Sequence, residues 1–185
     1  MAQEFTHWTV DTIREPKNVI GSWMEERKFD WIPIVSKAVS NIIDKNKSVL
    51  IITDHEHEWF EKYILANINK KNLSRPYLPF YSFNSFISNI DAVKSENDIQ
   101  LIHDMLQNSF PNGYFFWYIG KSQSNRANIA KISKQPFLWL MDEELSNSFY
   151  LNSSDENIDI RLLNMYRLFN KTLEAVLFAQ IDIDK

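Results

Sequence analysis

The stretch SVLIITDHEHEWFEKY, residues 48–63, joins three kinds of sequence in direct succession. Its first six residues are mostly apolar and β-branched, which is typical of a strand buried on both faces of a parallel sheet. A turn with two histidines and several acids follows. Apolar residues then recur at the spacing of one helical face, at Trp59, Phe60, Tyr63 and Ile64. The stretch therefore predicts a buried strand, a polar turn and a helix.

The same alternation continues towards the end of the chain. We expect further strands at 78–83, 113–119, 136–141 and 148–151, and helices at 98–110, 124–133 and 155–180. The last helix should begin with a capping box formed by Ser153 and Glu156. Strands that alternate with helices pair in parallel and place helices on both faces of the sheet. The sequence therefore predicts the α/β class, as a three-layer sandwich with a mostly parallel sheet.

The residues before this core are expected to form helices. They contain breaks near Pro16 and Gly21, and Asp30 is positioned to cap a helix that has Pro33 in its first turn. No internal repeat, low-complexity tract or linker divides the chain. We therefore expect one domain over residues 1–185, with N-terminal helices at 1–46 and an α/β core at 47–185.

Composition narrows the class of protein. The chain has no cysteine, which excludes disulfides and thiolate ligands and is typical of a reducing cytosol. It has no signal-peptide pattern at its start and no apolar run near the roughly 20 residues that span a bilayer. A net charge of −4 disfavours direct DNA binding. We therefore expect a cytoplasmic protein that binds neither membranes nor DNA directly. Basic residues gather in two places, and we interpret both as solvated helix ends: Lys70, Lys71 and Arg75, and Lys121, Arg126, Lys131 and Lys134.

The polar turn at 54–58, DHEHE, has the residue types of a metal site but not the spacing of one. Zinc-binding helices place two histidines four residues apart on one face, whereas His55 and His57 are two apart and would point about 200° away from one another. Thr53 and Glu56 match a capping box instead, and the acids favour the positive end of a helix dipole. We expect no metal site and no cofactor here.

The chain also lacks the common catalytic signatures. It contains no serine elbow, no lysine after a glycine-rich phosphate loop and no dinucleotide-binding glycine motif. His103 lies on or beside an apolar helical face and is interpreted as a partly buried, hydrogen-bonded histidine. The acids at 142–144 are interpreted as a solvated turn. We therefore expect no catalytic residues.

The last helix is apolar on more than one side. Such a helix needs two partners, of which one is expected to be the sheet and the other either a neighbouring subunit or another part of the same chain. Its main apolar face consists of Leu162, Tyr166, Phe169, Leu173, Val176 and Leu177, and Met165, Leu168, Ala175, Phe178 and Ala179 spread around it.

Several blocks of the sequence resemble a known family. The strand, turn and helix at 48–68, followed by the RPYLP run at 75–79, resemble the branch of the sugar isomerase (SIS) fold that contains phosphoheptose isomerases and DiaA-type initiator-associating proteins. The resemblance extends more specifically to the HobA family, a smaller relative that regulates chromosome replication through the initiator DnaA. It is carried by HEWFEKYILANINKKNLSRP (57–76), FFWYIGK (115–121), PFLWLMDEEL (136–145) and LLNMYRLFNKTLEAVLF (162–178).

This resemblance implies a five-stranded parallel α/β sandwich that assembles as a homotetramer. It also implies a non-enzymatic regulator of replication initiation, whose subunits bind the N-terminal domain of DnaA and scaffold initiator assembly at the origin. The alternative is a sugar-phosphate-binding SIS protein or a phosphoheptose-type isomerase. A leucine–phenylalanine pair contributes to the initiator-contacting surface in DiaA-type relatives, and the corresponding residues are Leu177 and Phe178. Phe178 could instead fill a subunit interface.

The two phosphate loops of the isomerase branch are altered here. The first, Gly-x-Gly-x-Ser, corresponds to residues 53–57, where the glycines and serine are absent and the carboxylates would repel a phosphate. The second, Ser-x-Ser-Gly-x-Thr, corresponds to residues 120–125, where one serine survives. We therefore expect lost catalysis and, as one open possibility, a residual anion site formed by Lys121, Ser122, Ser124 and Asn125.

Overall fold

The computed structural model describes residues 3–15, 21–71, 74–87, 89–93 and 95–183. Its centre is a five-stranded sheet in the order β3-β2-β4-β5-β6, in which every neighbouring pair is parallel. This confirms the α/β class and the parallel sheet. The strands are β2 (Ser48–Thr53), β3 (Phe80–Ser82), β4 (Tyr114–Lys121), β5 (Phe137–Met141) and β6 (Ser148–Leu151).

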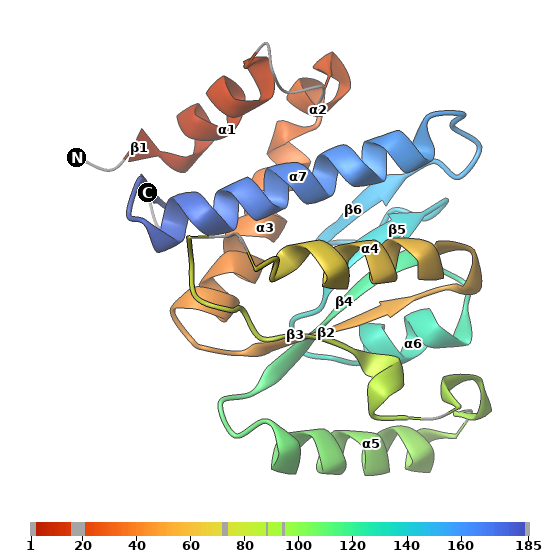
Figure 1. Ribbon diagram of the computed structural model, residues 1–185. Helices are drawn as coiled ribbons and strands as arrows, with labels where there is room; N and C mark the ends of the chain where they lie inside the picture. Colours follow the sequence, from red (N-terminus) through yellow and green to blue (C-terminus); the bar gives the residue numbers. More distant parts are fainter. Residues whose placement is uncertain (1–2, 16–20, 72–73, 88, 94, 184–185) are drawn as a thin grey trace.

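Helices cover both faces of the sheet (Figure 1). Both faces need cover because β2 places apolar side chains on each of them. Val49 and Ile51 belong to one hydrophobic cluster, and Leu50 and Ile52 belong to the other. The first cluster is completed by α3 (Lys28–Ile43), α4 (Glu58–Ile68) and α7 (Ile158–Leu177), and the second by α5 (Glu96–Ser109) and α6 (Asn125–Lys131).

The first cluster is rich in tryptophan. Trp31, Trp117 and Trp139 are fully buried, and the ring centroids of Trp117 and Trp139 lie 4.9 Å apart in an edge-to-face arrangement. Phe137 and Phe169 extend this aromatic contact from the sheet to α7. The core therefore fixes α7 on the sheet, which is the first of the two partners that its apolar sides require.

The second partner of α7 lies within the same chain. In Figure 1, α7 lies between the sheet and the N-terminal helices α1 (Phe5–Arg14) and α2 (Ser22–Glu26), and it packs against α1 and α3. A small parallel sheet of β1 (Gln3–Glu4) and β7 (Ile181–Asp182) joins the two ends of the described chain. The apolar residues on both sides of α7 therefore pack within the subunit, and they give no evidence for contact with a neighbouring subunit.

Two predicted helix starts are wrong. The helix α3 begins at Lys28, so Pro33 lies inside it, and the Asp30 carboxylate accepts a hydrogen bond from Nε of Arg27 at 2.6 Å instead of capping. At the other helix, Ser153 does not cap α7, because its N–H and hydroxyl both donate to the carboxylate of Asp142 at the end of β5. In both places, the side chain that local spacing predicts as a helix cap forms a hydrogen bond with a nearby charged side chain instead.

The described part of the chain also contains three short 3-10 turns: η1 (His55–His57), η2 (Phe83–Ser85) and η3 (Ile90–Ala92). The predicted break at Pro16 lies outside the described residues, and Gly21 precedes α2 with a positive φ of 80°. Among the described residues, no helix combines the length and the hydropathy that crossing a bilayer requires.

Candidate functional site

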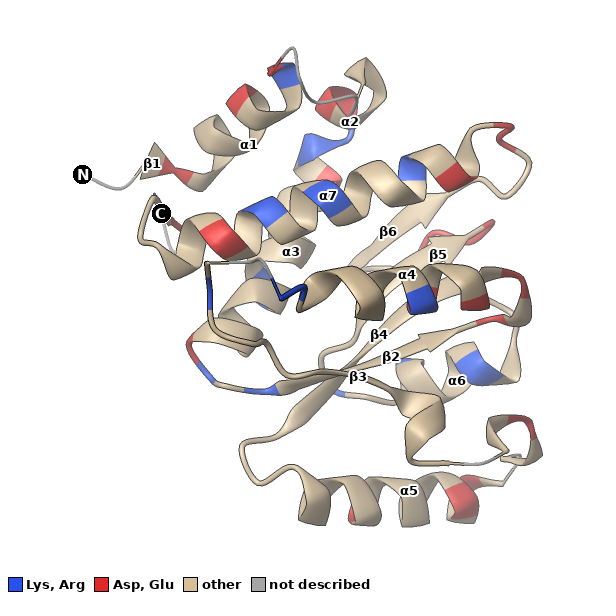
Figure 2. Ribbon diagram, viewed as in Figure 1, with Lys and Arg blue, Asp and Glu red and all other residues tan. Residues whose placement is uncertain are grey.

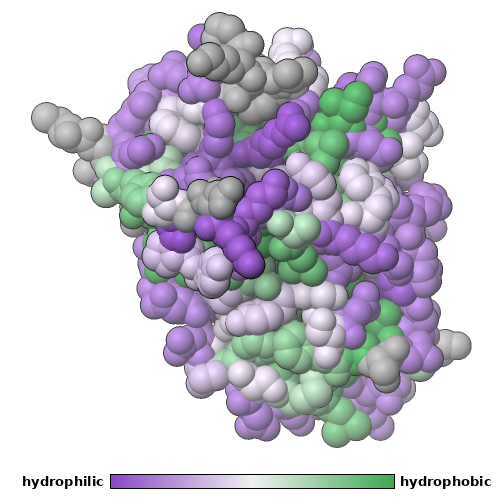
Figure 3. Space-filling view, viewed as in Figure 1, coloured by the Kyte–Doolittle hydropathy of each residue, from purple (hydrophilic) through white to green (hydrophobic). Residues whose placement is uncertain are grey.

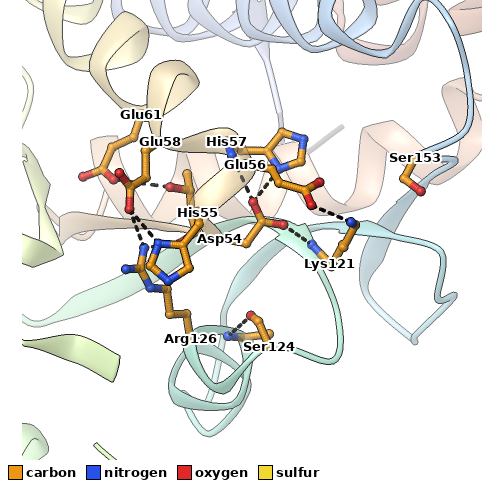
Figure 4. A network of polar contacts seen from close by, with 12 residues as sticks. Asp54, His55, Glu56, His57, Glu58, Glu61, Lys121, Ser124, Arg126 and Ser153 are labelled. Carbon is orange, nitrogen blue, oxygen red and sulfur yellow. Dashed lines mark hydrogen bonds and ion pairs between the residues drawn. The ribbon is translucent and has the colours of Figure 1, made fainter. Parts of the chain in front are cut away.

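The polar turn after β2 faces the carboxyl end of β4, where ligands bind in open α/β sheets. Asp54, rather than Thr53, caps η1: its Oδ1 accepts the backbone N–H of His57 at 3.0 Å and contacts Nδ1 of His57 at 2.5 Å. Its Oδ2 accepts the backbone N–H of Lys121 at 2.7 Å (Figure 4). The carboxylate of Asp54 thus binds two backbone amides and a histidine side chain, and these groups come from the segments that follow β2 and end β4.

The ionisation of Asp54 follows from these contacts. The side chain is buried, and burial alone would raise its pKa. The hydrogen bond from His57 and the backbone N–H of Lys121 outweigh burial and hold the pKa of Asp54 below its ordinary value. Asp54 therefore supplies a fixed negative charge to the amides that a bound phosphate would otherwise use.

Gly120 makes this approach possible. It precedes Lys121 at the end of β4 and has a φ of 143°, a conformation that side chains rarely adopt. A Cβ atom at Gly120 would lie 2.4 Å from Oδ2 of Asp54. Gly120, which stands where the isomerase loop has its first serine, thus leaves room for an internal carboxylate.

A second set of contacts is centred on Arg126 of α6. Its guanidinium donates to both carboxylate oxygens of Asp91 at 2.8 and 2.9 Å and to Glu58 at 3.0 Å. It also donates to the carbonyl of Thr53 at 3.2 Å. Hydrogen bonds from Arg126 lower the pKa of both Glu58 and Asp91. Arg126 is buried, and so is Arg75, whose guanidinium donates to the carbonyl of Ile68 and to Asn170. The interpretation of these two arginines as parts of solvated helix ends is therefore wrong.

The four residues expected to form a residual anion site do lie in one turn, but carboxylates and capping bonds already engage three of them. Nζ of Lys121 pairs with Glu56 at 2.8 Å, and the Ser122 hydroxyl donates to Glu143. The Ser124 hydroxyl accepts the N–H of Ala127 at 3.0 Å as the cap of α6, in which Asn125 is the first residue. This arrangement argues against an anion site.

The predicted capping box of Thr53 and Glu56 is also wrong. Glu56 pairs with Lys121, and the Thr53 hydroxyl contacts Glu61 of α4 at 3.5 Å. Glu61 is buried, and burial raises its pKa, opposed in part by a hydrogen bond with Ser82. The turn thus contains a buried acid that is stabilised as an anion, Asp54, and the first part of α4 contains one that is not, Glu61.

We expect Glu61→Gln to raise the melting temperature at pH 7 by a few degrees. Because the pKa of Glu61 is raised in the folded state, the protein loses stability as the pH rises from the unfolded-state pKa through the folded-state pKa. A glutamine amide does not ionise and therefore removes this loss. The check is thermal unfolding at pH 4 and 7, with the exposed Glu144→Gln as control. A loss of stability at pH 7 would show that the Glu61 anion is needed.

The remaining histidines have ordinary partners. His55 contacts Glu58 and Asp91 at 3.2 and 3.3 Å, and Nδ1 of His103 contacts the Tyr114 hydroxyl at 2.5 Å, as a partly buried, hydrogen-bonded histidine would. Burial raises the pKa of Tyr114 to about 12. Within the described residues, no group of three or more His, Cys, Asp or Glu side chains could hold a metal ion.

The expected partner-binding pair lies far from this turn. Helix α7 runs back along the sheet, so its last residues lie at the end opposite the polar turn (Figure 1). Leu177 packs partly against the core, while Phe178 follows the helix and leaves 51% of its surface exposed. Of the two residues, Phe178 is therefore the one available to a partner.

Comparison with known proteins gives one family and consistent structures. Residues 1–183 match the family model described as HobA, DNA replication regulator. The DNA replication regulator protein HobA of Helicobacter pylori is 27% identical over 186 residues, covering 98% of this chain and 99% of that protein.

Two solved structures from the same organism also match. The crystal structure of HobA superposes with a TM-score of 0.76 at 26% identity, covering 98% of this chain and 99% of the other. A complex of HobA with DnaA domains I–II gives a TM-score of 0.75 at 28% identity, covering 97% and 99%.

Proposed function

This chain belongs to the HobA family of DNA replication regulators, and from that premise we propose that it binds the N-terminal domain of its own DnaA. The observation that carries the proposal is the match, over nearly all of both chains, to a relative whose crystal structure is a complex with DnaA domains I–II. We further propose that it is a non-enzymatic, cytoplasmic scaffold that acts without direct DNA contact. The occupied turn around Asp54 supports a role without catalysis, because an internal carboxylate takes the donors that a sugar phosphate would need.

The proposed mechanism is multivalency. A single-domain subunit in a homotetramer would hold several initiator molecules on one rigid body and raise their effective concentration at adjacent origin sites. The gain in apparent affinity from such tethering is about 10² or more without any new contact to DNA. This mechanism is consistent with the net charge of −4, since the scaffold itself need not bind the DNA backbone.

Leu177 and Phe178 are proposed as part of the initiator-binding surface. Phe178 is aromatic, half exposed and placed at the end of a helix that the core holds rigidly. A fixed aromatic side chain can anchor a small interface at little cost in conformational entropy. Leu177, which precedes Phe178 and packs partly against the core, would help to hold the end of the helix in place rather than provide most of the contact.

The test is the mass of the complex formed with the isolated N-terminal domain of the same organism's DnaA, measured by light scattering after size exclusion. We expect a tetramer carrying one domain per subunit, and Phe178→Ala is expected to weaken binding about tenfold or more. Phe29→Ala, which removes a 72% exposed aromatic side chain from α3, is the matched control. Absence of a complex would refute the proposal, whereas dissociation of the tetramer by Phe178→Ala would assign this residue to the subunit interface.

A further inference from the structure

Helix α5 has an apolar outer face that no described part of the chain covers. Its inner residues Ile102 and Leu106 are buried against the sheet, as the helical periodicity requires. Leu101 and Met105 point outward one turn apart and are 67% and 37% exposed. Large apolar side chains left exposed at this spacing are typical of an interaction surface.

These two side chains border a groove of about 460 Å³, which we call the α5 groove. The opposite wall comes from the segment between β3 and α5, which contributes Phe86, Ile87 and Val93. In Figure 3, green side chains appear among paler ones in the lower part of the molecule, where α5 lies in Figure 1. The groove thus combines flexible and branched apolar side chains, with a methionine that can adapt to different partners.

Among the described residues, the charged side chain that lines the α5 groove is acidic, and so are the other charged side chains of α5. Helix α5 carries Glu96, Asp98 and Asp104 and contains no Lys or Arg, as the absence of blue on this helix in Figure 2 shows. Asp98 lies on the wall of the groove itself. An apolar groove beside acids favours a partner with apolar anchors flanked by basic residues.

We propose that the α5 groove is a second docking surface, which binds an amphipathic helix with a basic border from a partner protein. Leu101 and Met105 lie at the i, i+4 spacing that forms a ridge along a helix, and a second helix packs against such a ridge through its own i, i+3 and i+4 side chains. The surface lies on the face of the sheet opposite to α7, the helix that Phe178 follows (Figure 1). A scaffold could therefore hold a second protein while it holds the initiator.

Two other occupants fit these observations less well. A partner strand would add to the sheet edge, but the edge strand β3 has only three residues and is followed at once by η2. A second copy that docked the same surface onto itself would bring two acidic borders together, and like charges oppose such a symmetric contact. A basic helix has neither disadvantage.

The test uses a fluorescein-labelled 16-residue peptide with leucine at i, i+3, i+4 and i+7 and lysine at its border, and follows fluorescence anisotropy with the full chain. Leu101→Asp is expected to weaken binding at least tenfold, and Asp104→Lys to weaken it severalfold at low salt. Ile160→Asp, which places the same charge on a 54% exposed isoleucine of α7, is the matched control and is expected to change binding less than twofold.

Three outcomes would overturn the proposal. The first is equal binding of a peptide in which every lysine is replaced by glutamate, and the second is equal weakening by Leu101→Asp and Ile160→Asp. The third is a change in the mass of the unliganded protein caused by Leu101→Asp, which would assign the α5 groove to contact between copies of this chain. Binding of the DnaA domain is measured in parallel, so that failure of this proposal is distinguished from failure of the proposed function.

Discussion

Asp54→Ala is expected to destabilise the protein by about 3 kcal/mol, which lowers the melting temperature of a chain of this size by roughly 6 to 12 °C. The carboxylate accepts N–H groups from His57 and Lys121 in a buried setting, and alanine would leave these donors without a partner. Differential scanning calorimetry measures the change. Glu156→Ala removes an exposed acid just before α7 and should change stability by less than about 0.5 kcal/mol.

The contribution of Asp54 should also depend on pH. Its folded-state pKa lies below the ordinary value of 3.8, so the stabilisation is fully present above the unfolded-state pKa and is lost as the pH falls through the folded-state pKa. Asp54→Asn lacks this titration. The stability curves of the two proteins should therefore approach one another on acidification from pH 5 to 2, and parallel curves would contradict the ionised state assigned to Asp54.

The strand that opens this turn could be predicted from the sequence to the residue. Six mostly apolar, β-branched residues bounded by polar ones leave little choice for where the strand begins and ends, and β2 spans Ser48–Thr53 as expected. The next strand is shorter than predicted, at Phe80–Ser82 instead of 78–83. Pro79 has no N–H to donate, although its carbonyl accepts the N–H of Val49, and Phe83 already begins a 3-10 turn.

The capping of the turn could not be predicted in the same way. A local capping rule compares residues three apart and selects Thr53 and Glu56. The structure selects Asp54, because one of its oxygens is held by Lys121, which is 67 residues further along the chain. Arg126, which lies 73 residues further along the chain than Thr53, donates a hydrogen bond to the Thr53 carbonyl. Contacts of this range depend on which strands become neighbours, and local periodicity does not encode that information.

The ends of the chain show the same limit. Pairing of Gln3 with Ile181 in a two-residue parallel sheet leaves no periodic signal in the sequence. The sequence showed correctly that α7 has two apolar sides, but it could not show whether the second partner was a neighbouring subunit or the N-terminal helices. The structure assigns these sides to the sheet and to α1 and α3.

Gly120→Ala is expected to cost about 4 kcal/mol, more than Asp54→Ala, and the two effects should be coupled. One part of the cost is backbone strain at a φ of 143°, and the other is the 2.4 Å approach of the new Cβ to Oδ2 of Asp54. In an Asp54→Ala background that oxygen is absent, so the same glycine substitution should cost at least about 1 kcal/mol less. Urea unfolding of the four proteins in this cycle measures the coupling.

Gly113→Ala separates the two parts of this cost. Gly113 also has a positive φ, of 87°, but the nearest atoms to its added Cβ belong to the Lys47 side chain at 3.6 Å, an ordinary contact. That substitution should therefore show backbone strain without a clash and should be independent of Asp54. Equal costs at the two glycines, or additive effects of Gly120→Ala and Asp54→Ala, would mean that the carboxylate does not occupy the strand end as described, and the case against a phosphate ligand there would fail with it.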